Sequence, residues 1–123
     1  MMLTTAQADE VRRALRAAER RSGLRFGLFV CARNGLPAAG RRHFAERLHA
    51  AYGTESPDAV LVLVDLDARA LEIVTGENAR GRLTDGTCRA TARAMATAFS
   101  GGDLAGGLVY GFATLGQQAA ARR

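Results

Sequence analysis

The chain has 123 residues, enough for one hydrophobic core and too few for two domains. With 48% hydrophobic and 24% charged residues it has the composition of an ordinary globular protein, and its two distant cysteines exclude a disulfide-rich scaffold. No apolar run approaches the ~20 residues that span a bilayer. The segment Met1–Thr5 has neither the basic nor the apolar part of a signal peptide. We therefore expect a single domain, residues 1–123, in the cytoplasm.

Arginine supplies all 17 basic residues, and the formal net charge is +5. Two explanations are open: a bias toward GC-rich codons, which would also enrich Ala and Gly, or an anionic partner. The arginines are spread along the chain among Asp and Glu, and no basic patch carries the interleaved aromatic residues that stack on single strands. A specific nucleic-acid partner is therefore not predicted.

The chain opens with a predicted helix. Thr4 and Gln7 form the pattern of a capping box, and Gly23 is a usual residue just after a helix end. The apolar positions between them repeat at helical spacing: Ala8, Val11, Leu15 and Ala18. The apolar run Leu24–Cys31 then predicts a buried strand, followed by a turn at Arg33–Gly35.

A second helix is predicted from Pro37 to Tyr52, because Pro is favoured at the first helical position. Its inner face is expected to hold Phe44, Leu48 and Ala51. His43 and His49 are separated by about 240° around this helix, so they cannot share a metal ion, and we expect each at the surface or at the boundary of the core. Glu46 lies where it can pair with His43.

Two more strands follow the turn residues Ser56–Asp58. The run Ala59–Val64 is continuously apolar, as expected of a central strand covered on both faces. After a turn at Asp65–Arg69, the alternating run Ala70–Thr75 predicts a third strand that pairs antiparallel with the second. A polar loop, 76–82, comes next.

Two helices complete the chain. Thr84 or Asp85 caps the first, whose inner face is expected to carry Cys88, Ala92, Met95 and Phe99. Asp103 caps the second, whose inward residues are Leu104, Leu108, Phe112 and Leu115. Several glycines, each costing about 1 kcal/mol relative to Ala, fall inside this last helix: Gly106, Gly107, Gly111 and Gly116. They indicate either close backbone packing on the sheet or a wrong helix assignment.

The predicted order is helix, strand, helix, strand, strand, helix, helix. The first two strands and the helix between them form a βαβ unit, which is expected to be parallel and right-handed. With helices on both faces of a small mixed sheet, the predicted fold class is α/β, a three-layer α/β/α sandwich.

Several segments covering most of the chain occur in one order: Leu3–Val30, Phe44–His49 (FAERLH), Asp58–Asp65 (DAVLVLVD), Arg69–Gly76 (RALEIVTG), Leu83–Asp85 (LTD) and Phe99–Gly107 (FSGGDLAGG). The ordered set resembles the TPM-domain superfamily, and within it a short actinobacterial branch, a domain of unknown function. The resemblance implies an α/β/α sandwich. It also implies several functions as expectations: divalent-metal binding, phosphatase-like activity in plant photosystem repair, and accessory roles beside membrane complexes. The residue types that match the superfamily pattern are Asp58, Arg69, Thr75–Gly76 and Gly102–Asp103.

One candidate site lies at the carboxyl ends of the parallel strands, the usual ligand edge of such sheets. We expect Asp65, Asp67 and Asp103 to gather there, and their oxygens could bind Ca²⁺ or another divalent cation. The same residues also suit a turn and a helix cap, so both interpretations stay open.

A second candidate site lies at the opposite end of the sheet. It collects Ser56, Asp58, Thr75, Gly76, Glu77 and Asp85. Arg80 and Arg82 beside a helix start could hold an anion, although the Asp85 carboxylate would compete for the same backbone N–H groups.

Two functional hypotheses remain. The first is a non-enzymatic interaction or accessory module with an unknown protein partner, because Cys31 and Cys88 are expected to be buried and unreactive and no cofactor motif is present. The second is a metal-dependent, phosphatase-like hydrolase in which the aspartates hold a cation and Arg69 stabilises phosphoryl charge. The oligomeric state is left open, although the Gly107 and Gly111 spacing permits tight helix packing within or between chains.

Overall fold

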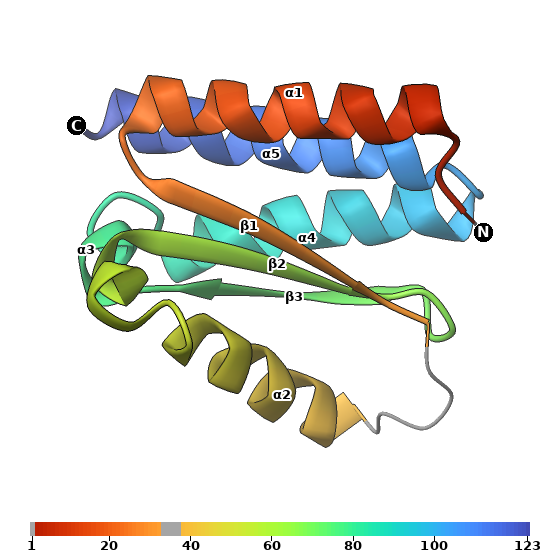
Figure 1. The fold of residues 1–123 in the computed structure, drawn as a ribbon, viewed down its shortest axis with the longest axis horizontal. Coiled ribbons are helices and arrows are strands. Elements are labelled where there is room, and N and C mark those ends of the chain that lie inside the picture. Colours follow the sequence, from red (N-terminus) through yellow and green to blue (C-terminus); the bar gives the residue numbers. More distant parts are fainter. Residues whose placement is uncertain (1, 33–37) are drawn as a thin grey trace.

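The structure, a computed structural model, describes residues 2–32 and 38–123 (Figure 1). The predicted turn at Arg33–Gly35 and the helix start at Pro37 lie outside the described residues. The elements in chain order are α1 (Thr5–Ser22), β1 (Arg25–Cys31), α2 (Ala38–Ala50), the 3-10 helix η1 (Gly53–Asp58), β2 (Ala59–Asp65), β3 (Ala70–Thr75), α3 (Glu77–Arg80), α4 (Asp85–Ser100) and α5 (Leu104–Ala121).

The sheet has the strand order β1-β2-β3 within the described residues. β1 pairs parallel with β2, from Arg25 opposite Ala59 to Cys31 opposite Asp65. β2 pairs antiparallel with β3, with Val60 opposite Thr75. Every residue of β2 is buried, which explains its continuous apolar run. Both predicted pairings are confirmed.

Helices cover both faces of the sheet, so the predicted α/β/α sandwich is confirmed. Figure 1 shows α2 alone on one side and α1, α4 and α5 on the other. The larger core lies on the second side and includes Phe26, Val62, Met95, Phe99 and Phe112. A smaller cluster of Ala45, Leu63 and Val74 lies under α2. No helix of the described ranges is long and apolar enough to cross a bilayer.

The last helix is confirmed, and its glycines pack against neighbouring helices rather than on the sheet. A Cβ atom at Gly107 would lie 2.9 Å from Cδ1 of Phe99, and one at Gly111 would lie 3.1 Å from Cγ of Met95. A Cβ at Gly116 would lie 2.7 Å from the Ala18 Cα atom of α1. These glycines therefore let α5 approach α4 and α1 closely, within one chain.

Three local expectations were wrong. The polar loop after β3 contains the one-turn helix α3, and the turn residues around Pro57 form the 3-10 helix η1. The helix α2 ends at Ala50, so Ala51 lies beyond it and is exposed, while Ala45 is fully buried. Phe44 and Leu48 pack against the small cluster under α2 as predicted, but the buried face of this helix includes Ala45 and His49 and not Ala51, and this difference matters for the site.

Candidate functional site

A pocket of about 570 Å³ opens where β3 ends. Its walls come from α2, η1, the end of β3, α3 and the first turn of α4. The sequence-predicted residues that line it are Ser56, Thr75, Gly76, Glu77 and Asp85. This is the second of the two sheet ends considered from the sequence, and the structure brings most of its predicted residues together.

One wall of the pocket is a close contact between backbones. The Gly76 N–H donates to the Ala59 carbonyl at 2.9 Å. A Cβ atom at Gly76 would overlap the Ser56 carbonyl oxygen and lie 2.6 Å from the Pro57 oxygen. The Asn78 side-chain amide donates to the Asp58 carboxylate at 3.0 Å, which fastens α3 to η1. Only glycine fits this approach of β3 to η1.

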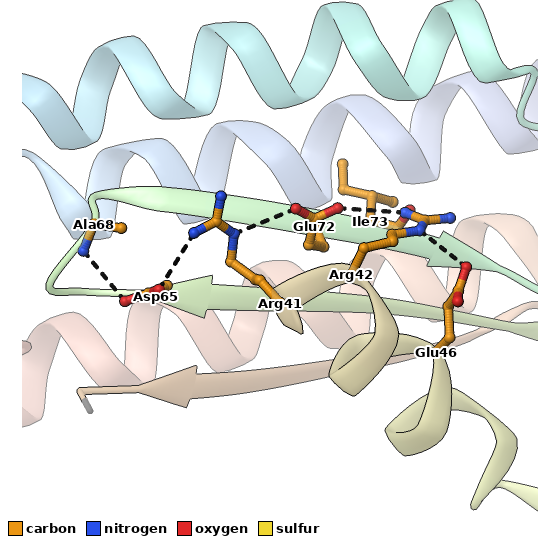
Figure 2. A network of polar contacts seen from close by, with 7 residues as sticks. All are labelled: Arg41, Arg42, Glu46, Asp65, Ala68, Glu72 and Ile73. Atoms are coloured by element: carbon orange, nitrogen blue, oxygen red, sulfur yellow. Dashed lines mark hydrogen bonds and ion pairs between the residues drawn. The ribbon is translucent and has the colours of Figure 1, made fainter. Parts of the chain in front are cut away.

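Arg42 on α2 is held in place by several partners (Figure 2). Its Nε donates to Glu46 at 3.2 Å, and its Nη1 donates to the Ile73 carbonyl at 2.8 Å. Its Nη1 also lies 3.7 Å from Glu72 Oε1. Glu46 therefore pairs with Arg42, whereas the sequence suggested His43 as its partner.

Other charged residues of the pocket are available to a ligand. Arg80, Glu77 and Asp85 are exposed and line the pocket. No ion pair joins any of them to another described residue. The pocket therefore presents a cation and two carboxylates beside a fixed backbone wall, and it suits a ligand that carries charges of both signs.

His49 is a pocket residue that lies deeper than the surface or boundary position expected for it. Its side chain is buried, with 9% exposure, and its Nε2 lies 3.0 Å from the Ala59 carbonyl oxygen. A carbonyl only accepts hydrogen bonds, so Nε2 of His49 is the donor in this contact. The signal that could have found it is its place one residue after Leu48 and four after Ala45, which puts it beside the apolar side of α2 and about 120° from the exposed His43.

The carboxylate end of the sheet, where Asp65, Asp67 and Asp103 were expected to gather, is occupied by contacts within the protein. Asp65 is 2% exposed, and its Oδ2 lies 3.4 Å from Nη1 of Arg41. Its Oδ1 accepts from the Ala68 N–H at 3.2 Å, which closes the β2–β3 turn. Arg41 also donates from Nε to Glu72 at 3.3 Å, so one guanidinium joins both strands to α2 (Figure 2). Asp65 thus serves a buried ion pair and a turn.

The other residues of that end also have local partners. Asp103 caps α5 by accepting from the Gly106 N–H at 2.9 Å. Arg69 has a positive φ of 51° and donates to the Ser100 carbonyl at 3.4 Å, while Asp67 is exposed. In residues 2–32 and 38–123, no three His, Cys, Asp or Glu side chains gather to hold a metal ion. The metal site at Asp65, Asp67 and Asp103 stays a prediction.

Only one of the two arginines of the predicted anion site lines the pocket. Arg80 lines the pocket, whereas the Arg82 guanidinium donates to the carbonyls of Ser22 and Ala119. Arg82 therefore lies against the C-terminal ends of α1 and α5, where a cation complements the helix dipoles. Thr84 is the N-cap of α4, accepting from the Thr87 N–H at 3.2 Å.

Burial affects the cysteines and Tyr52 of this protein. Cys31 is buried as expected, whereas Cys88 is only half-buried, and neither forms a disulfide. Burial raises the pKa of the Cys88 thiol, and the nearby Asp85 carboxylate raises it further. Burial also raises the pKa of Tyr52, against a smaller lowering by Arg25.

Comparison with known proteins identifies the family and the fold. A family model described as the TPM domain matches residues 1–118. No curated protein matches the chain. Among solved structures, the BA42 protein of the psychrophilic bacterium Bizionia argentinensis superposes with a TM-score of 0.82 at 19% identity, covering 99% of this chain and 84% of that chain.

Two N-terminal domains are also similar. One, from a P. gingivalis protein, has a TM-score of 0.80 at 23% identity and covers 94% of this chain and 75% of that chain. The other, from the cg2496 protein of Corynebacterium glutamicum, has a TM-score of 0.77 at 14% identity, with coverages of 96% and 74%. At these identities the likeness shows a shared fold.

Proposed function

The chain belongs to the TPM-domain family, and from that premise we propose that it is a non-enzymatic interaction module that binds its partner in the pocket at the end of β3. The observation that carries the proposal is the combination of a backbone wall at Gly76 with the exposed charges of Arg80, Glu77 and Asp85. A fixed wall preserves the shape of the pocket, and charges of both signs select the orientation of a ligand.

The chemistry of the pocket favours an extended peptide segment that carries both an acidic and a basic group. Arg80 would pair with the acidic group of the partner, and Glu77 and Asp85 with the basic one. Ser56 and Thr75 add hydroxyl groups that donate to or accept from a peptide backbone. The pocket volume of about 570 Å³ lies in the range of ligand sites, which hold a few residues of a peptide.

The test is a selection of peptides from a displayed library on the purified protein, followed by NMR titration of each selected peptide. We expect amide shifts to cluster at Ser56, Gly76 and Glu77. Arg80→Glu should weaken binding at least about tenfold, since losing an attraction and adding a repulsion is worth at least about 1.4 kcal/mol. The matched control is Arg93→Glu, an exposed arginine of α4 outside the pocket lining. Shifts elsewhere, or equal losses in both variants, would contradict the proposal.

A second candidate function is the metal-dependent, phosphatase-like reaction that the family resemblance suggested. It requires Asp65, Asp67 and Asp103 to bind one divalent cation, with Arg69 on the phosphoryl group. Asp65 would have to leave Arg41 for this, because that pair is buried. Hydrolysis of p-nitrophenyl phosphate with Mn²⁺ or Ca²⁺, lost in Asp67→Asn, would support this reaction over the interaction module. The actinobacterial branch and the cytoplasmic location stay predictions from the sequence.

A further inference from the structure

The strand β1 has one side without a strand partner among the described residues, because the sheet order places it at an edge. Its central residues Phe29 and Val30 are 39% and 40% exposed. Natural proteins usually protect a sheet edge with charge, proline or a covering segment. Residues 27–30 of this edge carry no charge and no proline.

The backbone hydrogen bonds show which groups of β1 point outward. The Cys31 carbonyl accepts from Leu66 N–H at the end of β2, so the odd-numbered residues face β2. The Phe26 N–H points the other way and donates to Glu19 of α1 at 3.0 Å. Since alternate residues of a parallel strand face opposite sides, the N–H and C=O groups of Leu28 and Val30 also face the open edge.

Two apolar hollows flank this edge, and they meet at Leu28. One hollow, of about 270 Å³, lies toward α2 and is lined by Leu28, Phe29, Leu48, Tyr52 and Leu61. The other, of about 230 Å³, lies toward α1 and is lined by Leu3, Val11, Leu15 and Leu28. Their one charged lining residue is Arg12, which Asp9 already pairs at 2.8 Å.

We propose that a second copy of this chain adds its β1 antiparallel to this edge, with the two-fold axis between the two Leu28 residues. Leu28 would then exchange backbone hydrogen bonds with Leu28 of the partner copy. The Val30 N–H would donate to the Phe26 carbonyl of the partner copy, and the sheet would run continuously through both chains.

The register of this pairing is self-complementary. Two-fold pairing at Leu28 places Phe29 of one copy opposite Gly27 of the other, on the face toward α2. Gly27 has no side chain, and Tyr52 and Leu61 lie beside it at the α2-side hollow. The Tyr52 hydroxyl occupies the place that a Cβ atom at Gly27 would take, so the Phe29 ring of the other copy would lie over the α2-side hollow beside Tyr52, and the symmetry repeats this contact.

The charge distribution favours a second copy over a charged peptide. The chain carries a net charge of +5, yet the edge and its two hollows are almost uncharged. The cations there are Arg12 and Arg25, and Asp9 and Glu55 already pair them, so an acidic peptide would find no free cation among these residues, whereas a second copy brings an equally neutral surface. One strand pair lies at the low end of interface sizes, below about 1,200 Å², so the dimer is weak and its population depends on concentration.

The first test is the mass of the whole chain in solution by sedimentation equilibrium, from about 10 µM to about 1 mM. We expect the weight-average mass to rise from 13.0 kDa toward twice that value. Val30→Lys places a charge on the edge and should hold the mass at 13.0 kDa. Tyr110→Lys is the matched control, because Tyr110 is 49% exposed on α5 and lies outside both hollows.

The second test reads the register directly. In a chain with Cys31→Ala and Cys88→Ala, a cysteine introduced by Leu28→Cys should be joined to its symmetry mate by a short bis-maleimide. One introduced by Arg25→Cys, near the end of the strand, should not. Circular dichroism establishes that each variant is folded.

Several outcomes would overturn the proposal. A constant mass of 13.0 kDa at every concentration would overturn it. This is the result expected if the β1 edge binds a different protein and not a second copy of the chain. Equal effects of Val30→Lys and Tyr110→Lys, or cross-linking at position 25 rather than 28, would also overturn it. The binding of peptides in the β3 pocket is unaffected by any of these results.

Discussion

Replacing Gly76 by Ala should destabilise the domain by about 3 kcal/mol. The added Cβ would overlap the Ser56 carbonyl oxygen and lie 2.6 Å from the Pro57 oxygen. Overpacking typically costs 1–3 kcal/mol, and we place this site at the upper end because the obstructing atoms are backbone. The Gly76 N–H bond to Ala59, at 2.9 Å, further limits how far β3 can shift. For 123 residues, an unfolding entropy of ~2.1 cal/mol/K per residue turns ~3 kcal/mol into a Tm decrease of ~12 °C.

The assay is thermal unfolding followed by circular dichroism, with Gly81→Ala as the matched control. Gly81 lies five residues further along, has helical φ and ψ of −66° and −19°, and a Cβ there would meet the Asn78 oxygen at an ordinary 3.5 Å. This control should be neutral or gain about 0.4–1 kcal/mol, because Ala restricts the unfolded chain. A Gly76→Ala variant within ~2 °C of the wild type would show that η1 is free to move away from β3. The pocket would then have no fixed wall.

Three further predictions concern charged and titratable side chains. Arg41→Leu leaves the Asp65 carboxylate, which is 2% exposed, without its cation. The free energy of unfolding, measured in urea, should fall by about 3–5 kcal/mol, and a decrease below about 1 kcal/mol would show that the ion pair contributes little to stability. Burial and, second, the Asp85 carboxylate raise the pKa of Cys88, so its thiolate forms at higher pH than that of free cysteine, and the Cys88 thiol should be alkylated more slowly than free cysteine at about pH 8. Asp85→Asn lowers this pKa and should speed the alkylation of Cys88. Equal alkylation rates in the wild type and in Asp85→Asn would contradict the role of Asp85. If the carboxylate end binds a divalent cation, Ca²⁺ or Mn²⁺ at a hundred times its Kd should add about 2.7 kcal/mol to stability, and Asp67→Asn should abolish the gain; no melting shift with any cation would refute that site.

The strands and long helices were predictable because their signals are local. The apolar run of β2 is continuous since both of its faces are covered, and Thr4 with Gln7 forms the expected capping box of α1. Gly107 and Gly111 were correctly kept inside a helix, although only the structure shows that they approach α4.

The residues that line the pocket from β3, α3 and α4 could be predicted from the sequence, whereas those from α2 could not. Thr75, Glu77 and Asp85 follow one another around the end of the sheet, so chain order alone brings them together. Arg42 and His49 come from α2, and their positions depend on the rotation of that helix about its axis. The buried ring of His49 donates a hydrogen bond to the Ala59 carbonyl, a contact between elements that no local pattern records.

The helix α1 packs along α5 (Figure 1). The Arg82 guanidinium donates to carbonyl groups at the C-terminal ends of both helices. The ribosome makes α1 before α5, so α1 is made before the helix it packs against. Until Gly116 has emerged, the position beside Ala18 stays open and the apolar side of α1 is uncovered. The domain therefore closes its core only after α5 has been made. During that interval the nascent chain presents an uncovered apolar helix, the kind of surface that chaperones bind.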